Sequence, residues 1–392
     1  MLRRRSRQYL VTVAMLVFVA VATVFAINLI VDPFNAYRET ATDYFDPGKR
    51  RLAPGMAEDY LYRRPDLVLF GTSRVGMGLS ESCAARPNAR IMKVVLYGSH
   101  WYEQSNMLRF IIEQDHRPDE IVIGTDFFAF SIISPPDGIA NFDKSRFSPD
   151  YNAFSYHAEN LVSAYALAES LEVAQSTITG NPRVISATRN VDQLGNGHLF
   201  AYMLWRAAQP APLGIKENVE QSLRSFERTL RAVQQAEIKI TIVFLPTHVL
   251  REVAIDRSGQ RELINLWKQR LVGIAARIGE GRIAVWDFQN CNPVTTEIVP
   301  KIGDLDHPMK YFYDPYHFTR TVGQDVLMQM LGDSDQTSEL GLVGVRLTLA
   351  NVQSYLHQVE REKQVYAADH PDQIEFFDQI LSGPPPQTRS IE

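Results

Sequence analysis

The sequence predicts an α/β protein, in which a three-layer, doubly wound parallel sheet follows an N-terminal transmembrane helix and carries a helical insert. Two observations predict the sheet: short apolar segments rich in Val and Ile recur along the chain, and helical patterns lie between several of them. Strands that alternate with helices are typical of parallel sheets. The transmembrane helix is predicted by a long, uncharged apolar run that follows a group of arginines.

Length and charge narrow the class of protein. The chain has 392 residues and a formal net charge of −5, enough for one or two domains with a sizeable core. No long basic run follows the N-terminus, so nucleic acid is not an expected partner. The two cysteines, Cys83 and Cys291, could form a disulfide in an oxidising compartment. Two unpaired, buried thiols are the alternative.

The N-terminal segment is predicted to anchor the chain. Arginines at positions 3, 4, 5 and 7 precede the apolar run 9–31, which is long enough to span a bilayer as a helix. A cleavable signal is the alternative, but its apolar region is shorter, about 7–15 residues. The arginines keep residues 1–8 in the cytoplasm, and Asp32-Pro33 ends the helix. We expect a single-pass protein of the cytoplasmic (inner) membrane, with everything after Val31 periplasmic or otherwise extracytoplasmic.

The α/β pattern begins after a membrane-proximal linker, residues 32–64, and is expected to form one domain over 65–332. Its strand candidates are short and apolar: Leu67–Phe70, Ile91–Leu96, Glu120–Ile123, Ile238–Phe244 and Ile283–Asp287. Apolar residues at steps of three and four predict helices over 219–233 and 263–278.

Two further segments complete the expected organisation. The interval 130–214 is too long for a bare loop and has a helical middle, 158–175, so we interpret it as a lid beside the site or as a structural insert. Residues 333–392 are interpreted as a C-terminal extension, an appendix with helical spacing from Val352 to Val359 and a disordered, proline-rich end.

A candidate nucleophile follows the first strand. Gly71 permits a sharp turn, and Ser73 would then lie at a helix N-terminus on the carboxyl edge of the sheet, where open α/β sheets bind ligands. The alternative is that Thr72 or Ser73 only caps that helix. A serine nucleophile needs a histidine base and an acid. Asp314 and His317 lie on a loop before the last helical face of the domain, on the same edge; a capping or packing role is the alternative for His317.

Four short blocks carry a resemblance to a known family: Gly71-Thr72-Ser73, Gly98, Gly124-Thr125-Asp126, and Asp314-Pro315-Tyr316-His317. Their order resembles that of the SGNH (GDSL-type) hydrolases, whose sheet is flavodoxin-like. The chain looks most like the membrane-anchored branch, which includes alginate O-acetylation and teichoic-acid D-alanylation proteins. The resemblance covers about residues 66–331.

The resemblance implies a role for each matching residue. Ser73 would be the nucleophile, His317 the base, and Asp314 the residue that orients His317. The oxyanion hole would comprise Ser73, Gly98 and the position of Asp126. Two positions depart from the family pattern. Thr72 replaces an aspartate, and Asp126 replaces an asparagine that normally donates to the oxyanion. Asp126 could be protonated through burial, or be structural with Arg74 neutralising it, or make hydrolysis weak.

Other polar and aromatic residues are candidate ligand contacts. Arg74, Trp101 and His248 are expected to bind substrate; packing of a helix on the sheet is the alternative for Trp101, and a surface position for His248. Asp304, Asp306 and His307 lie near Asp314 and His317 in sequence, but no pair with metal-ligand spacing supports a metal site. We expect neither a metal nor a cofactor, and no phosphate-loop motif occurs.

The expected function is serine-dependent O-acyl transfer, in which an acyl group, such as acetyl, passes through Ser73 to an exported glycan or polysaccharide. The expected partners are that glycan, the membrane, and a membrane protein that donates the acyl group. The alternatives are a carbohydrate esterase of the same fold, and a non-catalytic assembly or binding protein of a polysaccharide export complex.

Overall fold

The computed structural model describes residues 2–34, 36–37, 52–132, 142–179, 198–301, 308–332 and 338–386. The chain divides into two compact units. We call Met1–Tyr62 with Ala140–Ser186 the anchor unit, and Arg63–Ile139 with Ala187–Glu392 the sheet unit. Each is described by itself.

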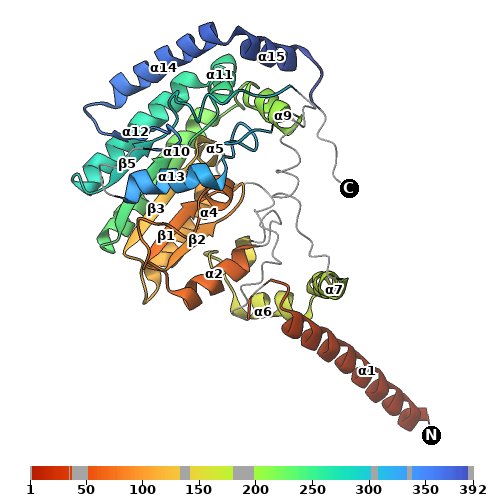
Figure 1. Cartoon of the computed structure of the whole chain (residues 1–392). Coiled ribbons are helices and arrows are strands. Elements are labelled where there is room, and N and C mark those ends of the chain that lie inside the picture. Colours follow the sequence, from red (N-terminus) through yellow and green to blue (C-terminus); the bar gives the residue numbers. More distant parts are fainter. Residues whose placement is uncertain are drawn as a thin grey trace. The chain divides into compact units, whose positions relative to one another are not determined.

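The sheet unit is built on a six-stranded, mostly parallel sheet with the order β2-β1-β3-β4-β5-β6 (Figure 1). The strands are β1 Leu67–Gly71, β2 Ile91–Val95, β3 Glu120–Thr125, β4 Lys239–Phe244, β5 Ala284–Asp287 and β6 Val345–Leu347. The first five are parallel, and β6 is antiparallel to β5. All residues of β1 and β3 are buried, as expected of parallel strands covered on both faces. The five predicted strands are confirmed.

The helices of the sheet unit pack in groups. Their bounds are α3 Ser73–Gly78, α4 Trp101–Glu113, α5 Phe127–Ser131, α9 His198–Ala207, α10 Ile215–Gln235, α11 Val249–Arg257, α12 Arg261–Gly279, α13 Arg320–Leu331, α14 Val352–Asp369 and α15 Pro371–Ser382. Helix α10 contacts α4 and α12, and α3 contacts α13. The face of α10 predicted to be apolar, Val219 to Val233, is buried. The strand order reverses at β1, where β2 lies on one side and β3 on the other. Open α/β sheets typically bind ligands at the carboxyl ends of the strands at such a reversal.

The C-terminal segment is more closely integrated than an appendix. It supplies β6, and its helices α14 and α15 join α9 and α11 in an apolar cluster that includes Phe200, Leu250, Tyr366 and Phe377. The buried Lys363 ammonium is paired with Asp256 of α11. Residues 387–392, the last part of the end expected to be disordered, lie outside the described residues.

The anchor unit contains α1 Leu2–Val31, α2 Leu52–Arg63, a 3₁₀ turn at Phe142–Lys144, α6 Ala153–Val162 and α7 Ala164–Thr179. Within α1, Ser6–Val31 is long and apolar enough to cross a membrane. The helix predicted over 158–175 is in fact two helices, because the Ser163 hydroxyl accepts the Ala166 N–H and starts α7 as a cap. The lid interpretation of residues 130–214 stays a prediction.

Both cysteines are free in the structure: Cys83 is buried and Cys291 is half-buried. The alternative of two unpaired thiols therefore describes this chain. Burial raises the pKa of the Cys291 thiol to about 12, so it is a packing residue and not a reactive thiolate.

Candidate active site

The nucleophile position is set by a close approach of two strand ends. A Cβ placed on Gly71 would lie 2.6 Å from the Gly124 carbonyl oxygen, and Gly71 has a φ of +154°. Only glycine therefore lets the end of β1 lie against the end of β3. Ser73 follows two residues later as the first residue of α3, half-buried at the carboxyl edge of the sheet.

Asp314 and His317 are held on a hairpin before α13. Phe312 and Phe318 form an antiparallel bridge, and the Tyr313 N–H donates to the His317 carbonyl at 2.8 Å. Inside the hairpin, Oδ1 of Asp314 accepts the backbone N–H groups of Tyr316 (2.7 Å) and His317 (3.0 Å). This Asx turn leaves Oδ2 free to face the His317 ring.

The structure brings Ser73, His317 and Asp314 together in one hydrogen-bonded line. Ser73 Oγ lies 2.9 Å from His317 Nε2, and His317 Nδ1 lies 2.7 Å from Asp314 Oδ2. Burial opposes ionisation of Asp314, but the adjacent His317 and the backbone N–H groups outweigh it, so the pKa of Asp314 lies below its usual value. An ionised Asp314 accepts the Nδ1–H of a neutral His317, which leaves Nε2 as the acceptor for the Ser73 O–H.

Two glycines bring the helices that carry this site into backbone contact. A Cβ on Gly323 of α13 would lie 1.9 Å from the Gly78 carbonyl oxygen of α3, and one on Gly78 would lie 2.2 Å from the Phe318 ring. Ser73 begins α3, and His317 closely precedes α13. The glycine contact therefore helps to set the distance between the Ser73 hydroxyl and the His317 imidazole.

Arg74 connects several loops at this edge of the sheet. Its side chain is 1% exposed and donates through Nε to the Tyr316 carbonyl at 3.1 Å. One terminal nitrogen donates to Asp126 Oδ1 at 2.8 Å, and the other to the Leu245 and Pro246 carbonyls at 2.7 and 2.6 Å. We expect Arg74 to bind substrate, but the hydrogen bonds described for its guanidinium all go to protein acceptors.

Asp126 has both carboxylate oxygens engaged. Oδ1 accepts from Arg74, and Oδ2 accepts the Thr72 hydroxyl at 2.6 Å. This geometry favours the alternative in which Asp126 is structural and Arg74 neutralises it. The two departures from the family pattern also fit each other, because a threonine hydroxyl can donate to a carboxylate that a second aspartate would repel.

Two backbone N–H groups remain as candidate oxyanion donors. The Ser73 N–H is the first of α3 and has no carbonyl partner within the helix. Gly98 is exposed with a φ of +70°, in a turn closed by the Ser99 N–H and the Leu96 carbonyl at 3.0 Å. A positive φ at this turn position favours glycine, and within the part of the chain that the structure describes the Gly98 N–H makes no hydrogen bond.

The other two expected ligand contacts are buried. Trp101 is 1% exposed and packs against Phe130 and Phe226 at ring distances of 5.2 and 4.9 Å. His248 is fully buried; its Nδ1 accepts the Leu250 N–H, and its Nε2–H donates to the Glu297 carbonyl at 2.6 Å. Trp101 is therefore a packing residue, and His248 caps the N-terminus of α11.

The sequence did not predict the contact between Arg251 and Tyr316 that holds the hairpin in place. Arg251 donates to the Tyr316 hydroxyl at 2.7 Å, and its guanidinium lies 3.9 Å from the centre of the Tyr316 ring. The partner of an isolated arginine depends on tertiary packing, so no sequence signal indicated this contact. The hydrogen bond from Thr72 to Asp126 could have been predicted, because both residues differ from those usual at these positions in the family that the chain resembles.

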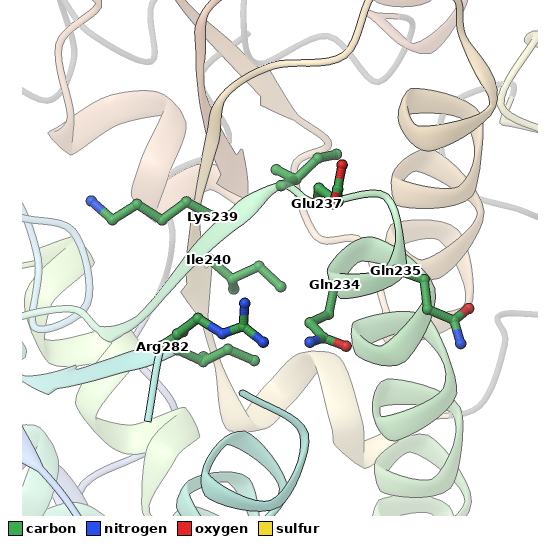
Figure 2. Close-up of a pocket in the computed structure, with 8 residues that line it drawn as sticks. Gln234, Gln235, Glu237, Lys239, Ile240 and Arg282 are labelled. Atoms are coloured by element: carbon green, nitrogen blue, oxygen red, sulfur yellow. The ribbon is translucent and has the colours of Figure 1, made fainter. Parts of the chain in front are cut away.

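A pocket lies at the opposite edge of the sheet, at the start of β4 and next to β5 (Figure 2). It encloses about 610 Å³, and Gln234 and Arg282 face each other there while Lys239 points away. Lys239 pairs with Glu120. The pocket lining contains no serine, histidine or cysteine, so the candidate chemistry lies at the carboxyl edge instead.

Among the described residues, no group of His, Cys, Asp and Glu side chains is arranged to hold a metal ion. Asp304, Asp306 and His307 lie outside those residues. No known protein family matches the sequence, and no curated protein does either.

Proposed function

We propose that this chain is a membrane-anchored, SGNH-type O-acyltransferase that transfers an acyl group, such as acetyl, to an exported glycan outside the cytoplasmic membrane. One observation carries the proposal: Ser73 Oγ, His317 Nε2, His317 Nδ1 and Asp314 Oδ2 form a continuous hydrogen-bonded line with contacts of 2.9 and 2.7 Å. Both Ser73 and His317 are partly exposed at the edge of the sheet, so a substrate can reach them.

The first half of the reaction forms an acyl-enzyme. Ser73 Oγ attacks the carbonyl carbon of an acyl ester while His317 Nε2 takes the hydroxyl proton. Asp314 stabilises the resulting imidazolium and keeps its orientation. The tetrahedral intermediate expels the donor alcohol, which receives the proton from His317, and the acyl group remains on Ser73 as an ester. In the second half, a sugar hydroxyl gives its proton to His317, attacks that ester and releases Ser73.

Negative charge on the tetrahedral intermediate is stabilised by the Ser73 and Gly98 N–H groups, a contribution of about 3 kcal/mol per donor in other acyl-transfer enzymes. The third donor of the family pattern is missing, because Asp126 accepts hydrogen bonds from Thr72 and Arg74. We infer an enzyme with a weaker oxyanion hole, which needs a bound acceptor rather than bulk water for efficient turnover.

The test uses the purified full chain in detergent with p-nitrophenyl acetate as the acyl donor. We expect release of p-nitrophenol and a mass increase of one acetyl group on Ser73. Ser73→Ala should abolish the adduct and lower the rate by about 10⁴-fold or more. Ser82→Ala, which removes an exposed hydroxyl nine residues away, is the matched control.

Two further outcomes separate the alternatives. Acylated product on an added oligosaccharide supports the transferase, whereas release of acid with no acylated sugar indicates an esterase. The engaged carboxylate of Asp126 specifically favours the third candidate, an assembly or binding protein. The absence of both turnover and a Ser73 adduct, in a chain that is folded by circular dichroism, would favour that candidate instead.

A further inference from the structure

Helix α7 of the anchor unit has an apolar face that is exposed in the part of the chain that the structure describes. One side of the helix, at steps of four and three, consists of exposed residues: Ala164, Ala168, Leu171, Gln175 and Ile178. Tyr165, Thr177 and Thr179, which lie beside this face, are exposed as well. The side chains of Leu171 and Ile178 are 56% and 84% exposed. The opposite side, with Ala166 and Ser170, is buried. The helix is therefore apolar on its exposed side as well as at the buried Ala166, unlike the amphipathic helix of a soluble protein.

Helix α6 extends the same property. Phe154 is 83% exposed and Val162 is 42% exposed. Residues 153–179 contain no lysine, arginine or aspartate, and their three glutamates are half-buried. None of these glutamates is on the exposed face of α7. We call the exposed side chains of Phe154, Val162, Leu171 and Ile178 the apolar face of the anchor unit.

Helices α6 and α7 pack against α1 (Figure 1), and a buried polar contact near the end of α1 holds them there. Asn28 is fully buried; its Nδ2 donates to the Leu161 carbonyl at 3.0 Å, and its Oδ1 accepts the Ser170 hydroxyl at 2.8 Å. Phe34 stacks on Tyr165. Earlier in α1, side chains from Tyr9 to Val21 are mostly exposed and apolar, so α6 and α7 enclose only the last turns of this helix.

Counting residues along α1 gives the depth of this contact. Arg7 is the last basic residue before the apolar run, and a bilayer core of about 30 Å is spanned by about 20 helical residues. A span that begins at Gln8 therefore ends near Ile27, just before Asn28. The contact between Asn28 and Ser170 is thus placed at the far boundary of the hydrocarbon core.

We propose that α6 and α7 lie at the outer surface of the bilayer and insert their apolar face among the lipid acyl chains next to α1. Helices of this kind enter the boundary between headgroups and acyl chains by about 5–10 Å. The apolar face would continue the exposed surface of α1, for which lipid is the expected solvent. This inference concerns the anchor unit alone and does not depend on the chemistry at Ser73.

Lipid is favoured over a protein partner by the composition of the face and by its continuity with α1. Specific protein interfaces are enriched in aromatic residues and arginine and carry a polar rim that fixes orientation. Phe154 is the one aromatic side chain of the apolar face. On α7 the face consists of aliphatic side chains, alanines and one glutamine, with no arginine, which suits a fluid apolar solvent better than a defined partner surface.

Tryptophan fluorescence in lipid vesicles tests the proposal on the full chain. All four native tryptophans, 101, 205, 267 and 286, belong to the sheet unit, so their spectrum can be subtracted. Phe154→Trp and Ile178→Trp place one reporter each on the apolar face. Asp150→Trp places a reporter at an exposed, polar position of the same unit, and Val21→Trp reports insertion of α1. The vesicles contain phosphatidylcholine brominated either near the headgroup or at the chain end.

We expect bromine near the headgroup to quench the reporters at 154 and 178 more than bromine at the chain end. The reporter at 150 should keep its emission, and the reporter at 21 should be quenched. If the reporter at 21 is quenched and those at 154 and 178 are not, the face does not meet lipid and the proposal is wrong. Stronger quenching at 154 and 178 by chain-end bromine would also overturn it, because α6 and α7 would then be embedded rather than superficial.

Discussion

At the residue scale, the site depends on a charged hydrogen-bond network that joins the ends of β1 and β3. Thr72 donates to Asp126, and Asp126 pairs with the buried Arg74. Thr72 and Asp126 both differ from the residues usual at these positions in the family that the chain resembles. In this chain, however, Thr72 and Arg74 together give each oxygen of the Asp126 carboxylate a hydrogen bond. Positions 72 and 126 should therefore be energetically coupled, since a direct hydrogen bond joins their side chains.

A double-mutant cycle measures that coupling. Asp126→Asn leaves Arg74 without its counter-charge, and Thr72→Asp places two carboxylates against each other, so each should lower the free energy of unfolding by about 2–4 kcal/mol. The double variant restores one charge and one amide and should recover most of the loss. Urea unfolding followed by tryptophan fluorescence checks this expectation; single effects that add within about 0.5 kcal/mol would contradict it.

The same double variant should increase the rate of Ser73 acylation. An asparagine at position 126 can donate an N–H toward the oxyanion, and one such donor is worth about 10²-fold or more in other enzymes. Initial rates with p-nitrophenyl acetate, compared between the double variant and the wild type, measure the gain. An unchanged rate in a stably folded double variant would show that position 126 does not face the reacting carbonyl.

His248 predicts a pH dependence of stability. Burial lowers its pKa to about 4, although the Glu297 carbonyl partly opposes the shift. Between about pH 6.5 and pH 4 the unfolded chain binds a proton that the folded chain rejects, so stability falls as the pH falls through this window, by up to about 3 kcal/mol. His248→Asn keeps an acceptor for the Leu250 N–H and should flatten this slope in urea unfolding at pH 7.5 and pH 5.5. His357→Asn, at an exposed histidine, is the control; an equal slope in wild type and His248→Asn would contradict the assignment.

The residues that could be predicted from sequence are those with a motif. Ser73 follows a glycine turn, and Asp314 and His317 have an Asp-x-x-His spacing. The structure brings these three residues into one hydrogen-bonded line. The orientation of Arg74, Trp101 and His248 depends on which elements pack above them. A single sequence does not specify this packing, so their burial could not be predicted.

At the element scale, the site is a consequence of how α3 and α13 meet. The helices touch through Gly323 and the Gly78 carbonyl, and the hairpin between Phe312 and Phe318 leads directly into α13. The strands were predictable because their burial makes them continuous apolar runs. β6 was missed because it has three residues and is only partly buried, and the break between α6 and α7 was missed because it depends on one serine cap.

Gly323→Ala tests the helix contact. The added Cβ would lie 1.9 Å from a backbone oxygen, so α13 must shift and lengthen the path from Ser73 to His317. We expect a fall in kcat of about 10²-fold, because catalysis is sensitive to displacements of about 1 Å, and a loss of stability. Gly273→Ala is the matched control, since its Cβ meets nothing within 4 Å in α12 and should stabilise by about 1 kcal/mol. Full activity with Gly323→Ala would show that this contact does not set the site geometry.

At the scale of the whole molecule, the chain divides into an anchor unit and a sheet unit, and the sheet unit continues far beyond His317. The C-terminal helices could not be assigned to the sheet unit from sequence. Their attachment consists of pairings across long separations, such as Lys363 with Asp256 and the Gln373 side chain with the Val299 N–H at 2.9 Å. Helical spacing predicts that α14 exists, but it does not say which surface the helix covers.

Phe377→Ala tests whether these helices are a structural part of the sheet unit. Phe377 is fully buried in the cluster shared with α9 and α11, and α11 begins at Val249, close to the loop whose carbonyls accept from Arg74. Truncating a buried phenylalanine should cost about 3–5 kcal/mol. Val365→Ala, which shortens a side chain that is 58% exposed on α14, should change stability by less than about 0.5 kcal/mol. Urea unfolding, followed by the four tryptophans of the sheet unit, compares the two variants. If Phe377→Ala shifts that transition no more than Val365→Ala does, α15 folds separately. A larger shift with Phe377→Ala shows that the chain beyond His317 stabilises the unit that contains the candidate site.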